Sequence, residues 1–312
     1  MSVFFSTDNL PEFHHAVVTI GTFDGVHLGH QKILKTVIDQ ARALQGESIV
    51  ITFHPHPRKL LLPQQDIKIL TPLEDKIAKL TELGIDHVIV IPFTNAFASL
   101  SAEEYIQDFL VAKCHPNTIV IGYDHHFGSD RKGNIHLLKA VQDKYHFNLI
   151  EIPEQLIDEA GISSTKIRKA LLAGDVAEAN SMMGRYYNLK GRVIKGRQLG
   201  RTMGYPTANI HVADSEQLMP GVGIYSVWVK YGSDTYGGML SIGYNPTVTE
   251  DTSLKMEVHI FDFNKEIYDE PLEIQWVQYL RPEYKFDSLE ALKKQLQADE
   301  IRAQQSLQEQ RY

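Results

Sequence analysis

A glycine-rich turn near the N-terminus carries two histidines at a spacing suited to phosphate chemistry. Residues 21–30 read GTFDGVHLGH and follow the apolar run 16–20, so the turn joins an expected strand to an expected helix. The backbone N–H groups of such a turn can approach a phosphate, and the helix N-terminus adds positive potential. His27 and His30 are three residues apart, so both imidazoles can face one phosphate. The alternatives are a plain turn with surface histidines and a metal pair, which lacks an evident third ligand.

A second segment of the first half offers hydroxyl groups and cations. Residues 162–168 read ISSTKIR, in which the hydroxyl residues can cap a helix while Lys166 and Arg168 can meet phosphate oxygens. Nucleotidyl transfer needs stabilisation of charge on the α-phosphate and on the departing pyrophosphate, but no nucleophile from the enzyme. The two segments together suit such a transfer, although a Ser-Ser-Thr run alone is more often only a helix cap.

The second half contains a basic, glycine-rich segment that ends in two neutral oxygen ligands. Residues 191–209 read GRVIKGRQLGRTMGYPTAN, and the segment is not a Walker A loop because no Gly-Lys-Ser/Thr sequence ends it. It is either a basic surface hairpin or a flexible flap over nucleotide phosphates. Thr207 and Asn209 are two residues apart on an expected extended segment, so their side chains point the same way and can share one Mg²⁺.

Glu257 lies in a segment with alternating polarity. Within residues 254–261, the even-numbered positions from Met256 to Ile260 are apolar and share one face of an expected strand. Glu257 and His259 share the other face. Glu257 is therefore either an ordinary exposed strand carboxylate or a carboxylate presented to a site.

The elements that must position the N-terminal turn alternate between short β-branched runs and amphipathic helical patterns. The expected strands are 16–20, 48–53, 87–91, 118–121 and 147–152. Several of them are continuously apolar, which is typical of strands in a parallel sheet covered by helices on both faces. The first half is predicted to be a doubly wound α/β domain that binds its ligands outside the carboxyl ends of the strands.

The periodicity changes near residues 184–191. The expected strands beyond that point are 223–231, 236–242, 254–261 and 272–280, separated by Gly, Asn, Pro and Asp turns. No long helical pattern interrupts them until Asp287, an N-cap that opens a helix carrying Leu289, Leu292 and Leu296. The second half is predicted to be a β-barrel with a C-terminal helix, and the domains are predicted to span 1–183 and 184–312.

Composition narrows the class of protein. The chain has 312 residues, enough for two domains with separate cores, and a formal net charge of −8, which argues against a nucleic-acid binder. No apolar run is long enough for a membrane span. Cys114 is the only cysteine, which suits a cytoplasmic protein because no intramolecular disulfide can form. No feature points to an obligate protein partner.

Several motifs occur in the order typical of one family. They are 21–30, 52–57 (TFHPHP), 122–128 (GYDHHFG), 162–168, 206–209 (PTAN), 242–247 (IGYNPT) and 256–259 (MEVH). In these motifs the chain resembles the bacterial bifunctional riboflavin kinase/FAD synthetases. The resemblance implies ATP-dependent phosphorylation of riboflavin to FMN, then adenylyl transfer from ATP to FMN giving FAD and pyrophosphate, with Mg²⁺ as cofactor. It also implies a nucleotidylyltransferase-like sheet in the first domain and a riboflavin kinase barrel in the second.

The resemblance also assigns roles in adenylyl transfer. His27 and His30 would be catalytic. ATP and its phosphates would contact Gly21, Phe23, Asp24, Gly25, His27, Gly29, His30, Ser164, Thr165 and Arg168. Pro57 and Asp124 would lie in the FMN site. His125 stands where phenylalanine is usual in the family, and Lys166 stands where arginine is common.

In the kinase domain, the resemblance makes Glu257 the base that orients the ribityl 5′-hydroxyl and accepts its proton. Thr207 and Asn209 would hold Mg²⁺. ATP and flavin would contact Gly191, Lys195, Gly204, Thr207, Asn209 and Arg281. Two other functions stay open: a nucleotidylyltransferase for another phosphorylated metabolite, which leaves Glu257 without a role, and a non-catalytic flavin-binding or regulatory protein.

Overall fold

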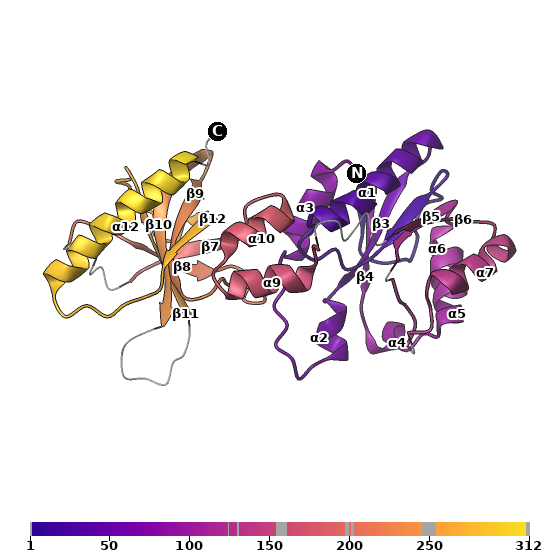
Figure 1. The fold of residues 1–312 in the computed structure, drawn as a ribbon. Coiled ribbons are helices and arrows are strands. Elements are labelled where there is room, and N and C mark those ends of the chain that lie inside the picture. The colour runs from indigo at the N-terminus through magenta and orange to yellow at the C-terminus, as the bar shows by residue number, and fades with distance from the viewer. Residues whose placement is uncertain are drawn as a thin grey trace. The chain divides into compact units, whose positions relative to one another are not determined.

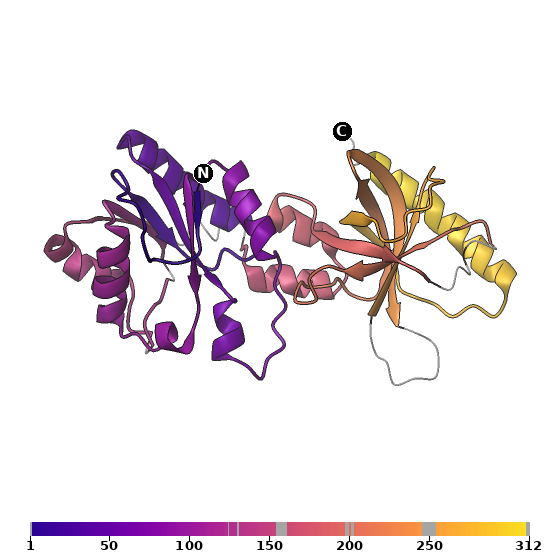
Figure 2. The same ribbon diagram turned by 180° about the vertical axis from the view of Figure 1, so that it is seen from behind.

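The computed structural model describes residues 2–123, 125–129, 131–153, 161–196, 200, 203–244 and 254–309. The chain divides into two compact units, Met1–Ser164 and Thr165–Tyr312, each with its own sheet (Figures 1 and 2). Among the described helices, none has the length and apolarity needed to cross a membrane.

The first unit is built on a parallel sheet. Its described strands are β1 (Ser2–Phe4), β2 (Val17–Ile20), β3 (Ser48–His54), β4 (His87–Pro92), β5 (Thr118–Gly122) and β6 (Asn148–Ile152). They lie in the order β1-β4-β3-β2-β5-β6, and every neighbouring pair is parallel. From β2 the chain runs outward through β3 and β4, then returns to β5 on the other side of β2. The carboxyl end of β2 is therefore the switch point, where ligands bind in such sheets.

Helices cover both faces of this sheet (Figure 1). They are α1 (Leu28–Ala43), α2 (Pro57–Leu61), α3 (Leu73–Glu82), α4 (Asn95–Ala98), α5 (Ala102–Glu104), the π-helix η1 (Tyr105–Val111), α6 (Ala112–Cys114) and α7 (Ile135–Tyr145). Apolar residues of α1 and α3 form one core with the sheet, and those of η1 and α7 form the other. The burial of β2 on both faces explains its continuous apolar run, and the predicted doubly wound fold is confirmed.

The second unit is built on a closed barrel. Its described strands are β7 (Asn188–Ile194), β8 (Ala208–Val212), β9 (Gly223–Tyr231), β10 (Asp234–Tyr244), β11 (Leu254–Ile260) and β12 (Pro271–Arg281). The order around the barrel is β10-β11-β8-β7-β12-β9, with antiparallel neighbours throughout. The predicted barrel is confirmed. In β11, buried positions alternate with half-buried ones, which is why its sequence alternates in polarity.

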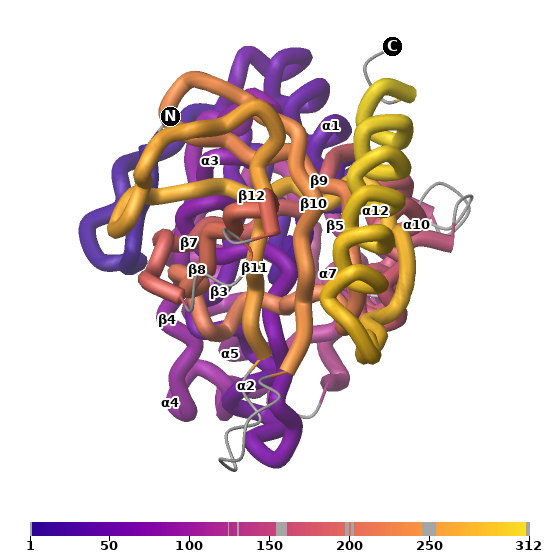
Figure 3. The backbone as a smooth tube through the Cα atoms, turned by 90° about the vertical axis from the view of Figure 1, so that its left-hand side faces the viewer, coloured from indigo at the N-terminus to yellow at the C-terminus, as the bar shows by residue number. Residues whose placement is uncertain are grey.

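The C-terminal helix α12 (Leu289–Glu309) packs on the outside of the barrel, beside β10 (Figure 3). Ala303 and Leu307 join an apolar cluster with Trp228 and Met239. The Ser306 hydroxyl donates a 2.6 Å hydrogen bond to the Ser226 hydroxyl, so the buried polar groups of this interface are paired. The predicted helix is present, although Leu289 at its start is exposed.

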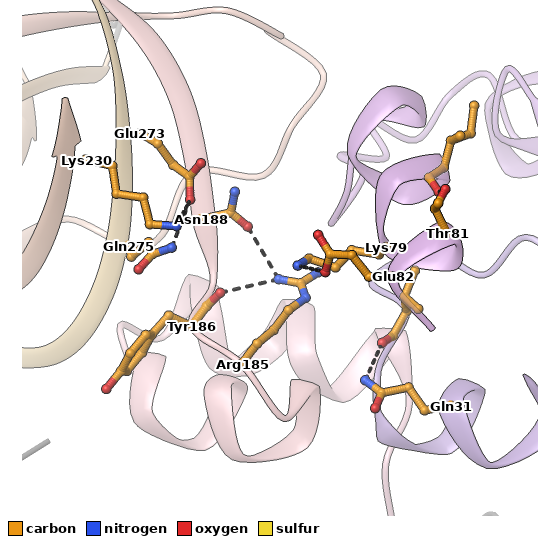
Figure 4. A network of polar contacts seen from close by, with 12 residues as sticks. Gln31, Lys79, Thr81, Glu82, Arg185, Tyr186, Asn188, Lys230, Glu273 and Gln275 are labelled. Carbon is orange, nitrogen blue, oxygen red and sulfur yellow. Dashed lines mark hydrogen bonds and ion pairs between the residues drawn. The ribbon is translucent and has the colours of Figure 1, made fainter. Parts of the chain in front are cut away.

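Two helices precede the barrel strands in the second unit, α9 (Ser164–Leu172), which starts at the unit boundary, and α10 (Val176–Met183). The Asn180 amide nitrogen donates to the Trp276 carbonyl at 2.8 Å, and its amide oxygen accepts from Tyr187 N–H at 2.7 Å. Nearby, Arg185 Nη1 donates to the Tyr186 carbonyl and to Asn188 Oδ1 (Figure 4). The two Asn180 bonds tie α10 to the barrel. The domain division predicted at 183/184 stays a prediction.

Candidate functional site

The β2–α1 loop, residues 21–27, adopts an unusual backbone conformation at the switch point of the sheet. Phe23, Gly25 and Val26 all have left-handed φ angles, of +46°, +90° and +40°. A side chain on Gly25 would also begin 2.9 Å from Leu70 Cδ1, so only glycine fits there. Left-handed residues that are not glycine cost free energy and persist where the surrounding structure imposes them.

Asp24 is one of the groups that impose this conformation. Its buried carboxylate accepts hydrogen bonds from Leu70 N–H at 2.9 Å and from Thr71 N–H at 3.1 Å. The Ser164 hydroxyl donates to the Asp24 carbonyl at 3.0 Å. The carboxylate thus holds the loop against residues 70–71, and the contact of Asp24 with ATP stays a prediction.

The two histidines meet at the start of α1. Their rings are stacked, with centroids 3.6 Å apart and planes 17° from parallel. His27 is the N-cap, and its Nδ1 accepts a 3.3 Å hydrogen bond from His30 N–H, which leaves the proton of a neutral His27 ring on Nε2. The predicted pairing of the two imidazoles at a helix N-terminus is therefore present.

His30 is held as a neutral imidazole. Burial is the main cause that lowers its pKa well below the usual 6.5, and the nearby His27 and Lys76 lower it further. Its Nδ1 atom is buried and has no hydrogen-bond partner among the residues that the structure describes. A buried, unpaired ring nitrogen is a group that a ligand can satisfy.

Lys76 was not anticipated from the sequence. It lies on α3 with 6% of its surface exposed, and its Nζ donates to the Thr22 carbonyl at 2.9 Å and to Thr52 Oγ1 at 3.1 Å. Burial lowers the pKa of Lys76 to about 8, while the charge of Asp24 opposes this shift. The sequence did contain one indication of its burial. Lys76 occupies a core position of α3, four residues before the buried Leu80.

The other predicted residues of adenylyl transfer are distributed as follows. Ser164 starts α9, whereas Thr165 and Arg168 belong to the second compact unit. Pro57 is the first residue of α2. Asp124 lies outside the described residues. Beside it, His125 has a buried Nε2 without a hydrogen-bond partner in the described part of the chain, and burial followed by the charge of His126 lowers its pKa to about 4.

The barrel unit contains a cavity of about 360 Å³. It is lined by Gly200, Met203, Tyr205, Thr207, Ile224, Met239, Leu240, Ser241, Glu257, His259, Arg281, Glu283, Tyr284, Phe286, Leu292, Leu296 and Asp299. Of the predicted kinase residues, Thr207, Glu257 and Arg281 are in this lining. The aromatic residues of the segment after β12 and the apolar residues of α12 were missed, because only the packing of α12 on the barrel brings them to the cavity.

Thr207, Asn209 and Glu257 come together through strand pairing. Glu257 on β11 lies directly opposite Asn209 on β8, and the Thr207 hydroxyl donates to Glu257 Oε2 at 3.4 Å. His259 Nδ1, 2.8 Å from the Pro206 carbonyl, anchors the segment just before Thr207. The site therefore presents a carboxylate, a hydroxyl and an amide, which are the oxygen ligands that Mg²⁺ accepts.

Four predicted kinase residues lie outside the cavity lining that the structure describes: Asn209, whose pairing with Glu257 is given above, and Gly191, Lys195 and Gly204. Gly191 pairs with Val212 inside the barrel wall, where a side chain would meet the His211 carbonyl at 2.5 Å. The ammonium of Lys195 lies over the Tyr268 ring at 5.9 Å. Gly204 has a φ of +87° in the segment before Thr207. Their assignment to ATP or flavin binding stays a prediction.

Arg281 forms a buried ion pair with α12. Its Nε is 2.9 Å from Asp299 Oδ1 and its Nη2 is 2.7 Å from Asp299 Oδ2, with side chains 7% and 0% exposed. Arg281 Nη1 donates to the Pro282 carbonyl, and Gln295 Nε2 donates to Asp299 Oδ1, both at 2.8 Å. The guanidinium lies 5.2 Å from the Tyr284 ring centre. Arg281 lines the cavity, as expected, but its charge is committed to holding α12 in place.

Substituting Asp299 with Ala is expected to destabilise the barrel unit by about 3–5 kcal/mol, because Arg281 is left buried without its partner. Lys230→Ala is the matched control, since it removes a partly exposed ion pair with Glu273 (Figure 4) and should cost less than about 1 kcal/mol. Both tryptophans of the chain lie in the barrel unit, so denaturant titration followed by their fluorescence measures this unit. Equal losses in the two variants would contradict the assigned role of the ion pair.

The fold and the two sites define a two-domain transferase class, in which a doubly wound sheet with paired histidines accompanies a barrel with a carboxylate in its cavity. The chain matches the family model of FAD synthetase over residues 10–166 and that of riboflavin kinase over residues 183–307. It belongs to the bifunctional riboflavin kinase/FMN adenylyltransferase family.

Relatives of similar length support this membership. The bifunctional riboflavin kinase/FMN adenylyltransferase of Listeria monocytogenes is 42% identical, over 91% of this chain and 90% of that protein. The protein of the same name from Escherichia coli K12 is 35% identical, over 93% and 92% of the two chains. A crystal structure described as a macrolide-efflux protein from Streptococcus pneumoniae is 35% identical and has a TM-score of 0.88, with 97% of this chain and 98% of that chain covered.

Proposed function

We propose that the chain phosphorylates riboflavin with ATP in the barrel unit and adenylylates FMN with a second ATP in the parallel-sheet unit. The observation that carries the kinase assignment is the convergence of Thr207 and Glu257, which line one cavity, with Asn209, which lies opposite Glu257 in the strand pairing. The stacked His27 and His30 at the switch point support adenylyl transfer. Two separate sites on one chain are what two successive reactions need.

In the kinase reaction, Glu257 aligns the 5′-hydroxyl of riboflavin and accepts its proton as the oxygen bonds to the γ-phosphorus of ATP and ADP leaves. The hydrogen bond from Thr207 orients the carboxylate. Thr207 and Asn209 would also hold Mg²⁺, whose charge offsets that of the ATP phosphates. The aromatic rings of Tyr284 and Phe286 supply apolar surface for a flat flavin ring in the same cavity.

In adenylyl transfer, a phosphate oxygen of FMN bonds to the α-phosphorus of ATP, and the bond to pyrophosphate breaks. No proton is removed by the enzyme, so its task is to position the reactants and stabilise charge. His27, His30 and the N-terminus of α1 supply that stabilisation, while Gly21, Gly25 and Gly29 let the nucleotide approach the backbone. Further donors proposed for the phosphates are Ser164, Thr165 and Arg168.

The remaining assignments follow from the same chemistry. Mg²⁺ is the proposed cofactor of both reactions, and the substrates riboflavin, FMN and ATP are the proposed partners. The single, buried Cys114 suits a cytoplasmic location. The net charge of −8 disfavours binding to nucleic acid.

Incubating the full chain with riboflavin, ATP and Mg²⁺ and then separating the flavins by chromatography tests the proposal. FMN should form first and FAD should follow. Formation of FMN without FAD would support only the kinase assignment. Conversion of supplied FMN to FAD without phosphorylation of riboflavin would support only the transferase assignment. The absence of both products would reject both assignments.

A fragment of residues 165–312 is expected to make FMN but no FAD, because it keeps the barrel, its cavity and the α10 contacts to Trp276 and Tyr187. A fragment of residues 184–312, which lacks α10, should be less stable than the longer one. Thermal unfolding followed by tryptophan fluorescence compares the two. A soluble but inactive longer fragment would show that the kinase reaction depends on the first unit.

A further inference from the structure

Lys76 is a buried amine next to the β2–α1 loop, and it has no role in either reaction as proposed above. Its Nζ donates to the Thr22 carbonyl at 2.9 Å and to Thr52 Oγ1 at 3.1 Å, and the Thr52 hydroxyl donates to the same carbonyl at 3.1 Å. The three groups form a closed triangle that fixes one peptide of the loop.

The orientation of that peptide follows from its planarity. In a trans peptide the carbonyl of residue 22 and the N–H of residue 23 point in opposite directions. Because the Thr22 carbonyl is turned toward Lys76, the Phe23 N–H points away from it. By binding the carbonyl, the ammonium group therefore turns the N–H of this peptide toward the other side of the loop.

The surroundings of Lys76 leave its charge poorly compensated. Both hydrogen-bond acceptors of Nζ are uncharged oxygens. Of the charged or titratable groups that act on it, Asp24 of the loop is the opposing charge, but its carboxylate is bonded to the amides of residues 70–71. His30 of α1 is the other group, and it is neutral. A buried cation of this kind is stabilised when an anion arrives nearby.

We propose that Lys76 is a positioning residue for adenylyl transfer, which orients the 22–23 peptide and supplies positive potential behind the β2–α1 loop for the phosphates of ATP. The inference rests on the proposed adenylyl transfer at this loop. Lys76 does not touch the reacting atoms; it acts through the backbone and through the field that it creates at the loop. Lys76 stabilises bound ATP and the transition state alike, so losing its charge raises KM more than it lowers kcat.

The role predicts a specific pH dependence. Burial lowers the pKa of Lys76 to about 8 in the free protein, and bound phosphates favour the charged ammonium. Affinity for ATP is therefore full below that pH and is lost as the pH rises above it. Where only the charged form binds ATP, KM rises about tenfold between pH 7 and pH 9.

The test is the KM for ATP of FMN adenylylation at pH 7, 8 and 9, divided by the KM for ATP of riboflavin phosphorylation by the same preparation. The ratio cancels the ionisation of ATP itself. In the wild type the ratio should rise about tenfold across this range. In Lys76→Met it should already be more than about tenfold higher at pH 7 and stay flat, with kcat within a few-fold of the wild type. Lys79→Met is the matched control, because Lys79 is a partly exposed lysine of the same helix, and it should behave like the wild type.

Two results would overturn the inference: a ratio that does not change with pH in the wild type, or the same rise in Lys76→Met as in the wild type. The first measurement needs no variant, so it decides the matter even if Lys76→Met does not fold. A wild-type chain that makes no FAD at any pH would instead reject adenylyl transfer itself.

Discussion

Replacing Glu257 with Gln is expected to lower riboflavin phosphorylation by about 10²- to 10⁴-fold while FMN adenylylation stays nearly normal. A primary hydroxyl is a poor nucleophile at neutral pH, so the reaction benefits from a carboxylate that aligns it and takes its proton. Glutamine keeps the size of the side chain and can still accept the hydrogen bond from Thr207, but it has no basicity. The fold should persist because Glu257 is only half-buried, on the polar face of β11.

The measurement is kinase turnover at saturating riboflavin and ATP with Mg²⁺, together with conversion of supplied FMN to FAD. Glu273→Gln makes the same chemical change elsewhere in the barrel, at a carboxylate paired with Lys230, and should leave both reactions intact. Kinase turnover within a few-fold of the wild type would remove Glu257 from the mechanism. Equal loss of both reactions would point to misfolding.

His30→Ala is expected to reduce FAD formation by about 10²- to 10³-fold, the typical cost of removing one group that stabilises charge in the transition state. The buried Nδ1 has no hydrogen-bond partner in the described residues, and the neutral ring is stacked on His27 at the start of α1. Riboflavin phosphorylation takes place in the other unit and should continue. FMN should therefore accumulate when riboflavin and ATP are supplied.

His136→Ala is the matched control, because this histidine is exposed in the first turn of α7. Chromatography of the flavins over time separates the two reactions in one experiment. FAD formation from supplied FMN at the wild-type rate in His30→Ala would exclude His30 from catalysis.

The local parts of both sites could be predicted from the sequence. The glycines and histidines of residues 21–30 fall between an apolar strand and an amphipathic helix, and the spacing of Thr207 and Asn209 places both on one side of an extended segment. These features depend on neighbours in the chain. The doubly wound sheet and the barrel could also be predicted from local patterns. A sheet strand such as β2 is buried on both faces and continuously apolar, whereas β11 of the barrel alternates in polarity.

Contacts between distant segments could not be predicted. The register that places Glu257 opposite Asn209 depends on pairing between β11 and β8, which are not consecutive strands. Asp24 is satisfied by amides more than forty residues away, and Arg281 by a carboxylate on another element. One sequence signal for such contacts was available, namely a charged residue at a core position of a helix. Asp299 follows Leu292 and Leu296 at helical spacing, which places it on the apolar face and indicates that it has a buried partner.

The contribution of α12 to the cavity has a consequence for how the protein is made. Leu292, Leu296 and Asp299 line the cavity, and all three belong to α12, which starts only at residue 289. Because synthesis proceeds from the N-terminus and domains fold as they emerge, the parallel-sheet unit can form its loop while the ribosome is still adding the barrel. The cavity of the barrel closes only after α12 has left the exit tunnel, so a premature stop codon before residue 289 would abolish the proposed kinase site and leave the β2–α1 loop folded.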